Sequence, residues 1–72
     1  MIASVRGKLI RKTSSEAVIE CNGIGYLINI SLNTSSKLPD INNDVFIYAI
    51  LIPREDSLNL FGFFDESEKE AF

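Results

Sequence analysis

The sequence predicts an all-β protein that folds as a small closed barrel. Apolar and polar residues alternate with a period of two along several short segments, as in strands that have one face in a core and one in water. Two of these segments are joined by Asn22 and Gly23, a dipeptide that favours a type I′ hairpin turn because both positions need positive φ. About five such segments follow at short spacing, with a brief helical segment after the third.

Length and composition limit the chain to one small globular domain. It has 72 residues, of which 46% are hydrophobic, so we expect a single thin core and no disordered chain. No apolar run approaches the roughly 18 residues that a membrane-spanning helix needs, and the first residues lack the apolar stretch of a signal peptide. We therefore expect a soluble cytoplasmic protein with no membrane partner.

The residues that most often perform chemistry are missing or isolated. The chain has no histidine and one cysteine, Cys21, which excludes the usual general base, an intramolecular disulfide and a cysteine metal site. The net charge of −3 has the wrong sign for a domain that holds nucleic acid by bulk charge. We expect no catalytic residues, no metal and no cofactor, and we interpret Cys21 as a small core residue.

The first half of the chain predicts three strands. Val5, Gly7 and Leu9 fall on one face of the first, and Gly7 predicts a bend or a bulge there. In the third strand, alternation places Tyr26 and Leu32 on the same face as the residues between them at 28 and 30. The expected strands cover residues 4–12, 15–21 and 24–32, with a polar turn at 13–15.

A short helical turn is expected between the third and fourth strands. Residues 33–38 could form it, with Asn33 or Thr34 as its N-cap. Pro39 would end the turn, and a polar loop over residues 40–44 would lead into the next strand.

The second half predicts a long hairpin, with strands over residues 45–52 and 58–64. The first of these strands is apolar on both faces, whereas a small barrel buries only one face of each strand. Its outer face therefore needs cover from a terminal helix, a partner chain or further domain structure, and we favour self-association. That face consists of Phe46, Tyr48, Ile50 and Ile52.

The loop of this hairpin carries Arg54, Glu55 and Asp56. Acidic residues in a turn most often just solvate it, since Asp and Ser form local hydrogen bonds there. Arg54 has two interpretations that stay open: a surface ion pair with its neighbours, worth under about 1 kcal/mol, or a phosphate contact. The loop is nevertheless the first place to look for function, because two apolar strands would hold it out in water.

Two further groups of side chains allow a functional and a structural interpretation. The basic residues of the first strand, expected on its outer face, usually solvate and protect an edge, but a basic stripe could also contact phosphates. Aromatic residues on small barrels can stack on single-stranded bases; here each sits within an apolar strand, which favours core or interface packing. The two groups are Arg6, Lys8, Arg11 and Lys12, and Tyr26, Tyr48, Phe61 and Phe63.

The last eight residues change in character. Asp65 or Ser67 could cap a helix whose first turn is rich in acids, as the helix dipole prefers. We expect a domain over residues 1–64 and the start of a helix over 65–72 that leads into further protein. The overall pattern predicts a five- to six-stranded Greek-key barrel of the OB type; periodicity alone leaves an SH3-like barrel open.

A set of residues resembles one known family along the whole chain. Gly23-Ile24-Gly25-Tyr26 is followed at a fixed distance by Arg54-Glu55-Asp56 and then by Leu60-Phe61-Gly62-Phe63. The first of these motifs alone is weak, but together they are specific. They resemble the N-terminal domain of RuvA, the bacterial subunit that binds Holliday junctions. Further matching residues are Met1-Ile2, Arg6-Gly7, Glu20 and Leu38-Pro39.

The resemblance implies an OB-fold domain that assembles as a homotetramer and presents a concave basic face to four-way junction DNA. Glu55 and Asp56 match the acidic pin, four copies of which meet at the centre of the junction. The family works with the RuvB ATPase and the RuvC resolvase in recombination, repair and the SOS response to DNA damage. It continues into a helix-hairpin-helix domain that supplies most phosphate contacts.

A second function, from a different class, stays open. An OB-type barrel can also be a generic single-strand-binding or protein-interaction domain. The acidic tip disfavours single-strand binding, because such a protein would place Lys, Arg or aromatic residues there.

Overall fold

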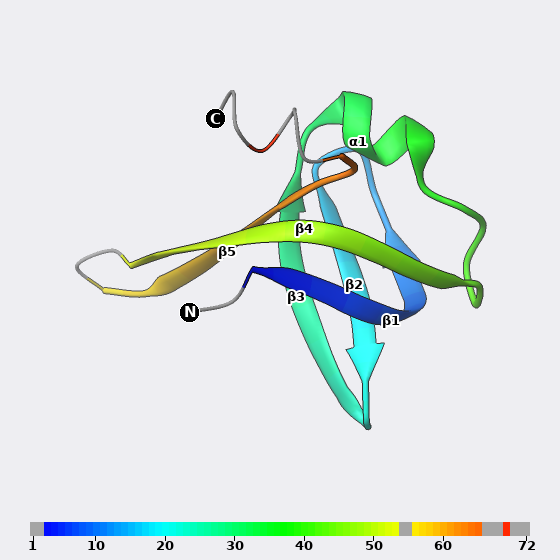
Figure 1. Ribbon diagram of the computed structural model, residues 1–72, viewed down its shortest axis with the longest axis horizontal. Coiled ribbons are helices and arrows are strands. Elements are labelled where there is room, and N and C mark those ends of the chain that lie inside the picture. The colour runs from blue at the N-terminus through cyan, green and yellow to red at the C-terminus, as the bar shows by residue number, and fades with distance from the viewer. Residues whose placement is uncertain (1–2, 54–55, 66–68, 70–72) are drawn as a thin grey trace.

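The computed structural model describes residues 3–53, 56–65 and 69, and it shows a closed five-stranded barrel with one short helix. The strand order around the barrel is β1-β2-β3-β5-β4, with β4 closing onto β1 (Figure 1). All neighbouring pairs are antiparallel except β3 with β5, which is parallel. This confirms the predicted all-β barrel of the OB type. The elements are β1 (Ser4–Lys12), β2 (Glu16–Cys21), β3 (Ile24–Ile30), α1 (Leu32–Lys37), β4 (Asp44–Pro53) and β5 (Leu58–Phe63).

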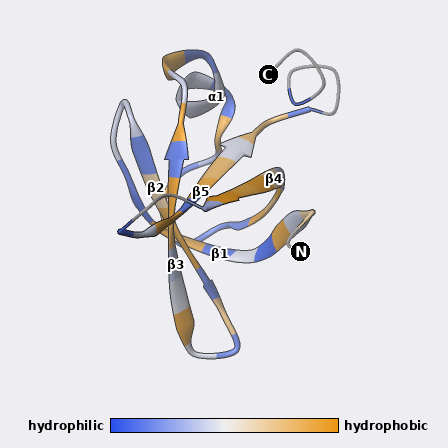
Figure 2. Cartoon of the chain, turned by 90° about the vertical axis from the view of Figure 1, so that its left-hand side faces the viewer, coloured by the Kyte–Doolittle hydropathy of each residue, from blue (hydrophilic) through white to orange (hydrophobic). Residues whose placement is uncertain are grey.

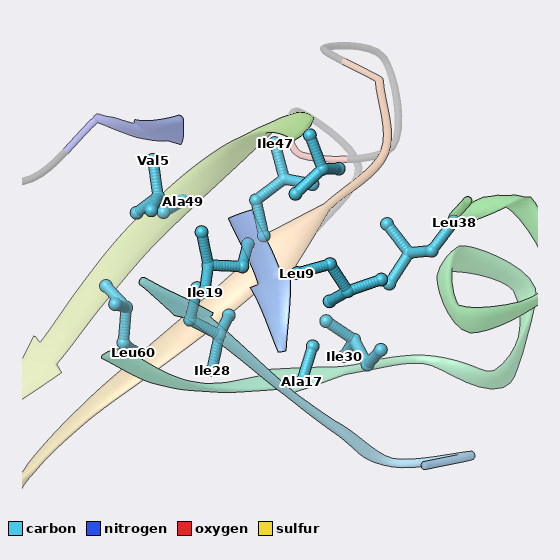
Figure 3. Close-up of a cluster of buried hydrophobic side chains, with 11 residues drawn as sticks. Val5, Leu9, Ala17, Ile19, Ile28, Ile30, Leu38, Ile47, Ala49 and Leu60 are labelled. Atoms are coloured by element: carbon cyan, nitrogen blue, oxygen red, sulfur yellow. The ribbon is translucent and has the colours of Figure 1, made fainter. Parts of the chain in front are cut away.

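The core is formed by the inward-facing residues of every strand, as the alternating pattern predicts. Val5, Leu9, Ala17 and Ile19 are all buried, and they belong to the faces predicted for the first two strands. Figure 3 shows these side chains meeting others from β3, β4 and β5, together with Leu38 from the segment after α1. Cys21 is half-buried and packs against this cluster, and its Sγ–H donates to the Arg6 carbonyl oxygen at 2.9 Å.

The hairpin turn between β2 and β3 has the predicted geometry. Asn22 and Gly23 have φ values of 51° and 86°, so both lie in the left-handed region that a type I′ turn requires. Cys21 and Ile24 are partners across the two strands, which leaves a two-residue loop.

β1 serves two neighbours in succession. Residues 4–8 pair with β4, and residues 8–12 pair with β2. A Cβ atom at Gly7 would collide with the carbonyl oxygen of Glu20 and lie 2.9 Å from the Cys21 Sγ, so the missing side chain is what lets β1 approach β2 here. The register shift that was expected near Gly7 lies slightly later, between Leu9 and Arg11.

This bulge corrects the predicted orientation of one basic residue. Strict alternation would send Lys12 outward, but the extra residue in β1 leaves Lys12 opposite the buried Ala17 and Arg11 opposite the outer Val18. The Lys12 Nζ then donates to the carbonyl oxygens of Leu38 and Pro39 at 3.5 and 3.3 Å. Lys12 therefore ties the α1–β4 connection to the barrel and is not part of an outer basic stripe.

The helix begins earlier than the sequence pattern predicts. It covers Leu32–Lys37, and its N-cap is Ser31, whose hydroxyl accepts a hydrogen bond from the Thr34 N–H at 3.0 Å. The expected caps at Asn33 and Thr34, and the strand expected to continue to Leu32, are therefore wrong. The Ser31 side chain forms a local hydrogen bond with the backbone, and this bond ends β3. Leu32 therefore belongs to the helix, where it is 70% exposed.

Helix α1 closes one end of the barrel (Figure 1). Thr34 and Ser35 are buried there, and the Ser35 hydroxyl donates to the Thr13 carbonyl oxygen at 2.8 Å. The helix expected from residue 65 lies mostly outside the described residues, although the Lys69 N–H donates to the Asp65 carbonyl oxygen at 3.3 Å. Within the described ranges, no helix is long and apolar enough to cross a membrane.

Substituting Gly62 by alanine should destabilise the barrel from its interior. The new Cβ would lie 2.7 Å from Ile28 Cγ2 and 2.7 Å from Ile47 Cδ1, and overpacking of this kind costs about 1–3 kcal/mol. Urea unfolding would measure the loss. Gly25→Ala is the matched control, because its nearest contact is the Val18 Cγ1 at 3.3 Å on an exposed surface. Equal losses for the two variants would contradict this account of the core.

Candidate nucleic-acid interface at the β4–β5 hairpin

The β4–β5 hairpin extends beyond the barrel. Pairing of β1 with β4 ends at Ser4 and Tyr48, and pairing of β3 with β5 begins at Asn29 and Phe61. The last pairs of the hairpin therefore have no third strand beside them among the described residues, and Figure 1 shows the ribbon reaching away from the barrel body. These pairs are Leu51 with Leu60, Ile52 with Asn59, and Pro53 with Leu58.

The tip of this ribbon carries the predicted acidic site. Asp56 and Ser57 are exposed, and no hydrogen bond or ion pair involves the Asp56 carboxylate within the described part of the chain. Asn59 Nδ2 donates to the Ser57 hydroxyl at 3.2 Å and so orders the β5 side of the turn. Arg54 and Glu55 lie outside the described residues.

The sequence explains why the ribbon forms and where it ends. Apolar residues continue along β4 well past its last pair with β1. Figure 2 shows β4 as a largely hydrophobic strand. Many of these residues are β-branched or aromatic and favour extended structure. Pro53 occupies the last position of β4, where a residue without an N–H is tolerated. The polar residues Asp56 and Ser57 precede β5, which begins at Leu58.

The outer face of β4 is apolar, as predicted. Phe46 is 39% exposed, and Tyr48, Ile50 and Ile52 are half-buried, whereas Val45, Ile47 and Ala49 on the other face are buried. The Phe46 and Tyr48 rings meet edge to face, with centroids 5.2 Å apart and an interplanar angle of 86°. The register adds Phe61 of β5, which lies opposite Ile50. The structure thus presents an apolar strip along the outer face of β4.

The basic residues of β1 have different surroundings. The Arg6 guanidinium lies over the Phe46 ring, 5.4 Å from its centroid, so Arg6 borders the apolar strip of β4 through a cation–π contact. Lys8 is exposed between Glu20 of β2 and Asp44 of β4, its cross-strand partners. Arg11 is exposed on the outer face further along. The predicted stripe therefore consists of Arg6, Lys8 and Arg11, without Lys12.

The aromatic residues pack more than they protrude. Tyr26 contacts the core cluster and Phe63 is 7% exposed, which agrees with the preference for packing over base stacking. Within the described ranges, no group of three or more His, Cys, Asp or Glu residues could hold a metal ion.

Two features at the ends of β5 are not predicted by the sequence pattern. Leu58 is 69% exposed beside the acidic tip, although its place in an apolar segment suggested ordinary strand packing. Only the register shows that Leu58 lies past the last residue that the barrel can cover.

At the other end of β5, Lys37 pairs with Asp65 at 3.7 Å and lies 5.8 Å from the centroid of the Phe64 ring. Their separation in sequence gave no signal for this contact.

Comparison with known proteins identifies the family. The sequence model of the family described as the RuvA N terminal domain matches residues 1–62. The chain is 50% identical over 72 residues to the Holliday junction branch migration complex subunit RuvA of Flavobacterium psychrophilum, 51% identical to that of Christiangramia forsetii and 47% to that of Chloroherpeton thalassium. All of the chain is matched, but it spans only 37%, 37% and 36% of these relatives. The chain belongs to the RuvA N-terminal domain family.

Proposed function

We propose that this domain binds Holliday junctions as part of a branch-migration complex in DNA recombination and repair, with its acidic hairpin tip at the centre of the junction. The observation that carries this proposal is the exposed Asp56 at the end of a ribbon that projects from the barrel. Family membership supports the DNA target, because the relatives are named as junction branch-migration subunits.

The tip would act by repulsion. A carboxylate about 4 Å from a phosphate is disfavoured by about 1 kcal/mol in water and by several times more where the dielectric constant falls. Asp56, with Glu55 next to it in sequence, therefore cannot hold the DNA backbone. At the crossover these acids would keep the duplex arms apart and guide strands without binding them, which suits DNA that must slide. Arg54 would either pair with them or contact a phosphate at the edge of the site.

Assembly would place several tips together. The apolar strip of Phe46, Tyr48, Ile50 and Ile52 suits the interface between subunits of a homotetramer, because exposed apolar surfaces usually mark contacts with a partner. The Arg6 guanidinium over Phe46 would lie at the border of that interface. Lys8 and Arg11, on the adjoining outer face of β1, are the described basic residues best exposed for secondary phosphate contacts.

The wider assignment follows the family. We infer that residues 65–72 begin a helix leading into a helix-hairpin-helix domain, and that the whole protein works with the RuvB ATPase and the RuvC resolvase in the bacterial cytoplasm. The domain itself would act as a scaffold and would carry no catalytic residues.

A generic single-strand-binding function is less well supported. Such barrels combine a positive groove with exposed aromatic side chains. Here Tyr26 packs on the core, Phe63 is buried and Phe46 lies under Arg6. The chain is also acidic, with a net charge of −3.

Neutralising the tip should separate binding from migration. In the full-length gene product, the double substitution of Glu55→Gln and Asp56→Asn should leave junction affinity unchanged or raise it by up to about tenfold, because repulsion of phosphates is removed. Branch migration should change in rate or control. Titrations at one fixed salt concentration and a strand-exchange assay with the ATPase motor would measure the two effects.

The control for this experiment is Asp40→Asn, which removes an exposed acid from the connection between α1 and β4, away from the tip. It should alter neither quantity. Weaker binding together with normal migration in the double variant would contradict the proposed role of the tip.

Disrupting the apolar strip should lower the oligomeric state. Ile50→Glu would place a charge in the proposed interface, where an unpaired buried charge is strongly unfavourable. Light scattering on the 72-residue chain should show a mass near four times 8.0 kDa for the native sequence and a smaller species for the variant. Leu27→Glu is the control, since Leu27 is 55% exposed on β3 outside the strip and should leave the mass unchanged. A native monomer would refute the interface.

A further inference from the structure

The end of the β4–β5 ribbon combines an acid with an exposed apolar side chain. Leu58 is 69% exposed, whereas Leu9, Leu38 and Leu60 are between 0% and 7% exposed. Leu58 forms the last described pair of the hairpin with Pro53, which is also exposed. Asp56 stands two residues before it. The most distant described part of the ribbon thus offers apolar surface immediately beside a negative charge.

The register explains why the barrel cannot cover Leu58. Alternation places it on the same ribbon face as Leu60, whose partner Leu51 packs against the core cluster. Leu58 is one step further out on that face, past the reach of β1 and β3. No other described residue lies across from it except Pro53. An apolar side chain in this position gains from contact only when a partner reaches the tip.

The charge beside Leu58 restricts what that partner can be. Asp56 disfavours a phosphate beside Leu58, so the backbone of a nucleic acid is the less favourable contact for this side chain. A nucleobase presents a flat apolar face without charge, and proteins do insert apolar side chains between base steps that they unstack. A base is therefore the part of DNA that both Leu58 and Asp56 accept.

We propose that Leu58, with Pro53 beside it, contacts the face of a nucleobase that is unstacked at the branch point of the junction. The inference rests on the proposed function, since it needs the tip to lie at the crossover. Unpaired or weakly paired bases cost least to unstack, and the branch point is where such bases occur. The acid would keep phosphates away while the leucine stabilises an opened base, so the two residues would act together on strand separation.

A fluorescent base analogue tests this contact directly. A four-way junction with 2-aminopurine at the branch point should brighten when the full-length protein binds, because the probe loses its stacking neighbour. Leu58→Ala should reduce that increase by about twofold or more, and Leu58→Met, which keeps an apolar side chain of similar volume, should retain it. A probe placed within a duplex arm should respond to none of the variants.

Leu32→Ala is the matched control. Leu32 is 70% exposed, almost the same fraction as Leu58, but it lies on α1 and not on the hairpin (Figure 1). Its replacement should leave the 2-aminopurine signal unchanged. The comparison therefore separates a contact at the tip from the general loss of an exposed leucine.

Two results would overturn the inference. The first is an unchanged signal in Leu58→Ala while the protein still binds the junction, which would leave the proposed function intact. The second is a change in solution mass caused by Leu58→Ala, which would assign Leu58 to a contact between copies of the chain. A native protein that binds no junction would overturn both proposals together.

Discussion

The arrangement of the molecule depends on the offset between the two neighbours of β4. Its first half pairs with β1 through residues 44–48, and its second half pairs with β5 through residues 48–53. Closure of a small barrel requires strands that are staggered in this way. The offset closes the barrel with one half of β4 and lets the other half, with β5, leave it as a two-stranded ribbon. The position of Asp56 at the end of this ribbon follows from the register of β4 with its two neighbours.

Close backbone approaches make this closure possible. β1 must turn from β4 to β2 within a few residues, and Gly7 removes the side chain that would otherwise collide with Glu20. On β5, the absence of a side chain at Gly62 leaves room for Ile28 and Ile47 in the barrel interior. The core is thin in a chain of 72 residues, so these two positions matter more than they would in a larger domain.

The hairpin tip and the outer face of β1 carry different charged residues. Acid occupies the described end of the ribbon at Asp56, whereas Arg6, Lys8 and Arg11 lie on the outer face of β1. In the function proposed above, this distribution would let the domain position DNA around a point that it does not hold. That proposal would reconcile the net charge of −3 with junction binding.

Local sequence rules predict the parts of this fold that local chemistry decides. Alternation predicts the first three strands, two apolar runs predict the strands of the long hairpin, and Asn22-Gly23 predicts the tight turn with its positive φ values. The rules fail where one residue shifts the register: the bulge after Leu9 turns Lys12 inward, and the Ser31 hydroxyl ends β3 early. The exposure of Leu58 was also beyond prediction, since it depends on where β1 and β3 stop.

The central claim is that this domain recognises the four-way shape of DNA. Binding to a four-way junction should be compared with binding to linear duplex and to single-stranded DNA of the same nucleotide content, at one fixed salt concentration, because affinities without it cannot be compared. We expect the full-length protein to prefer the junction over either by at least about tenfold, or about 1.4 kcal/mol. Equal affinity for duplex, or a preference for single strands, would contradict it.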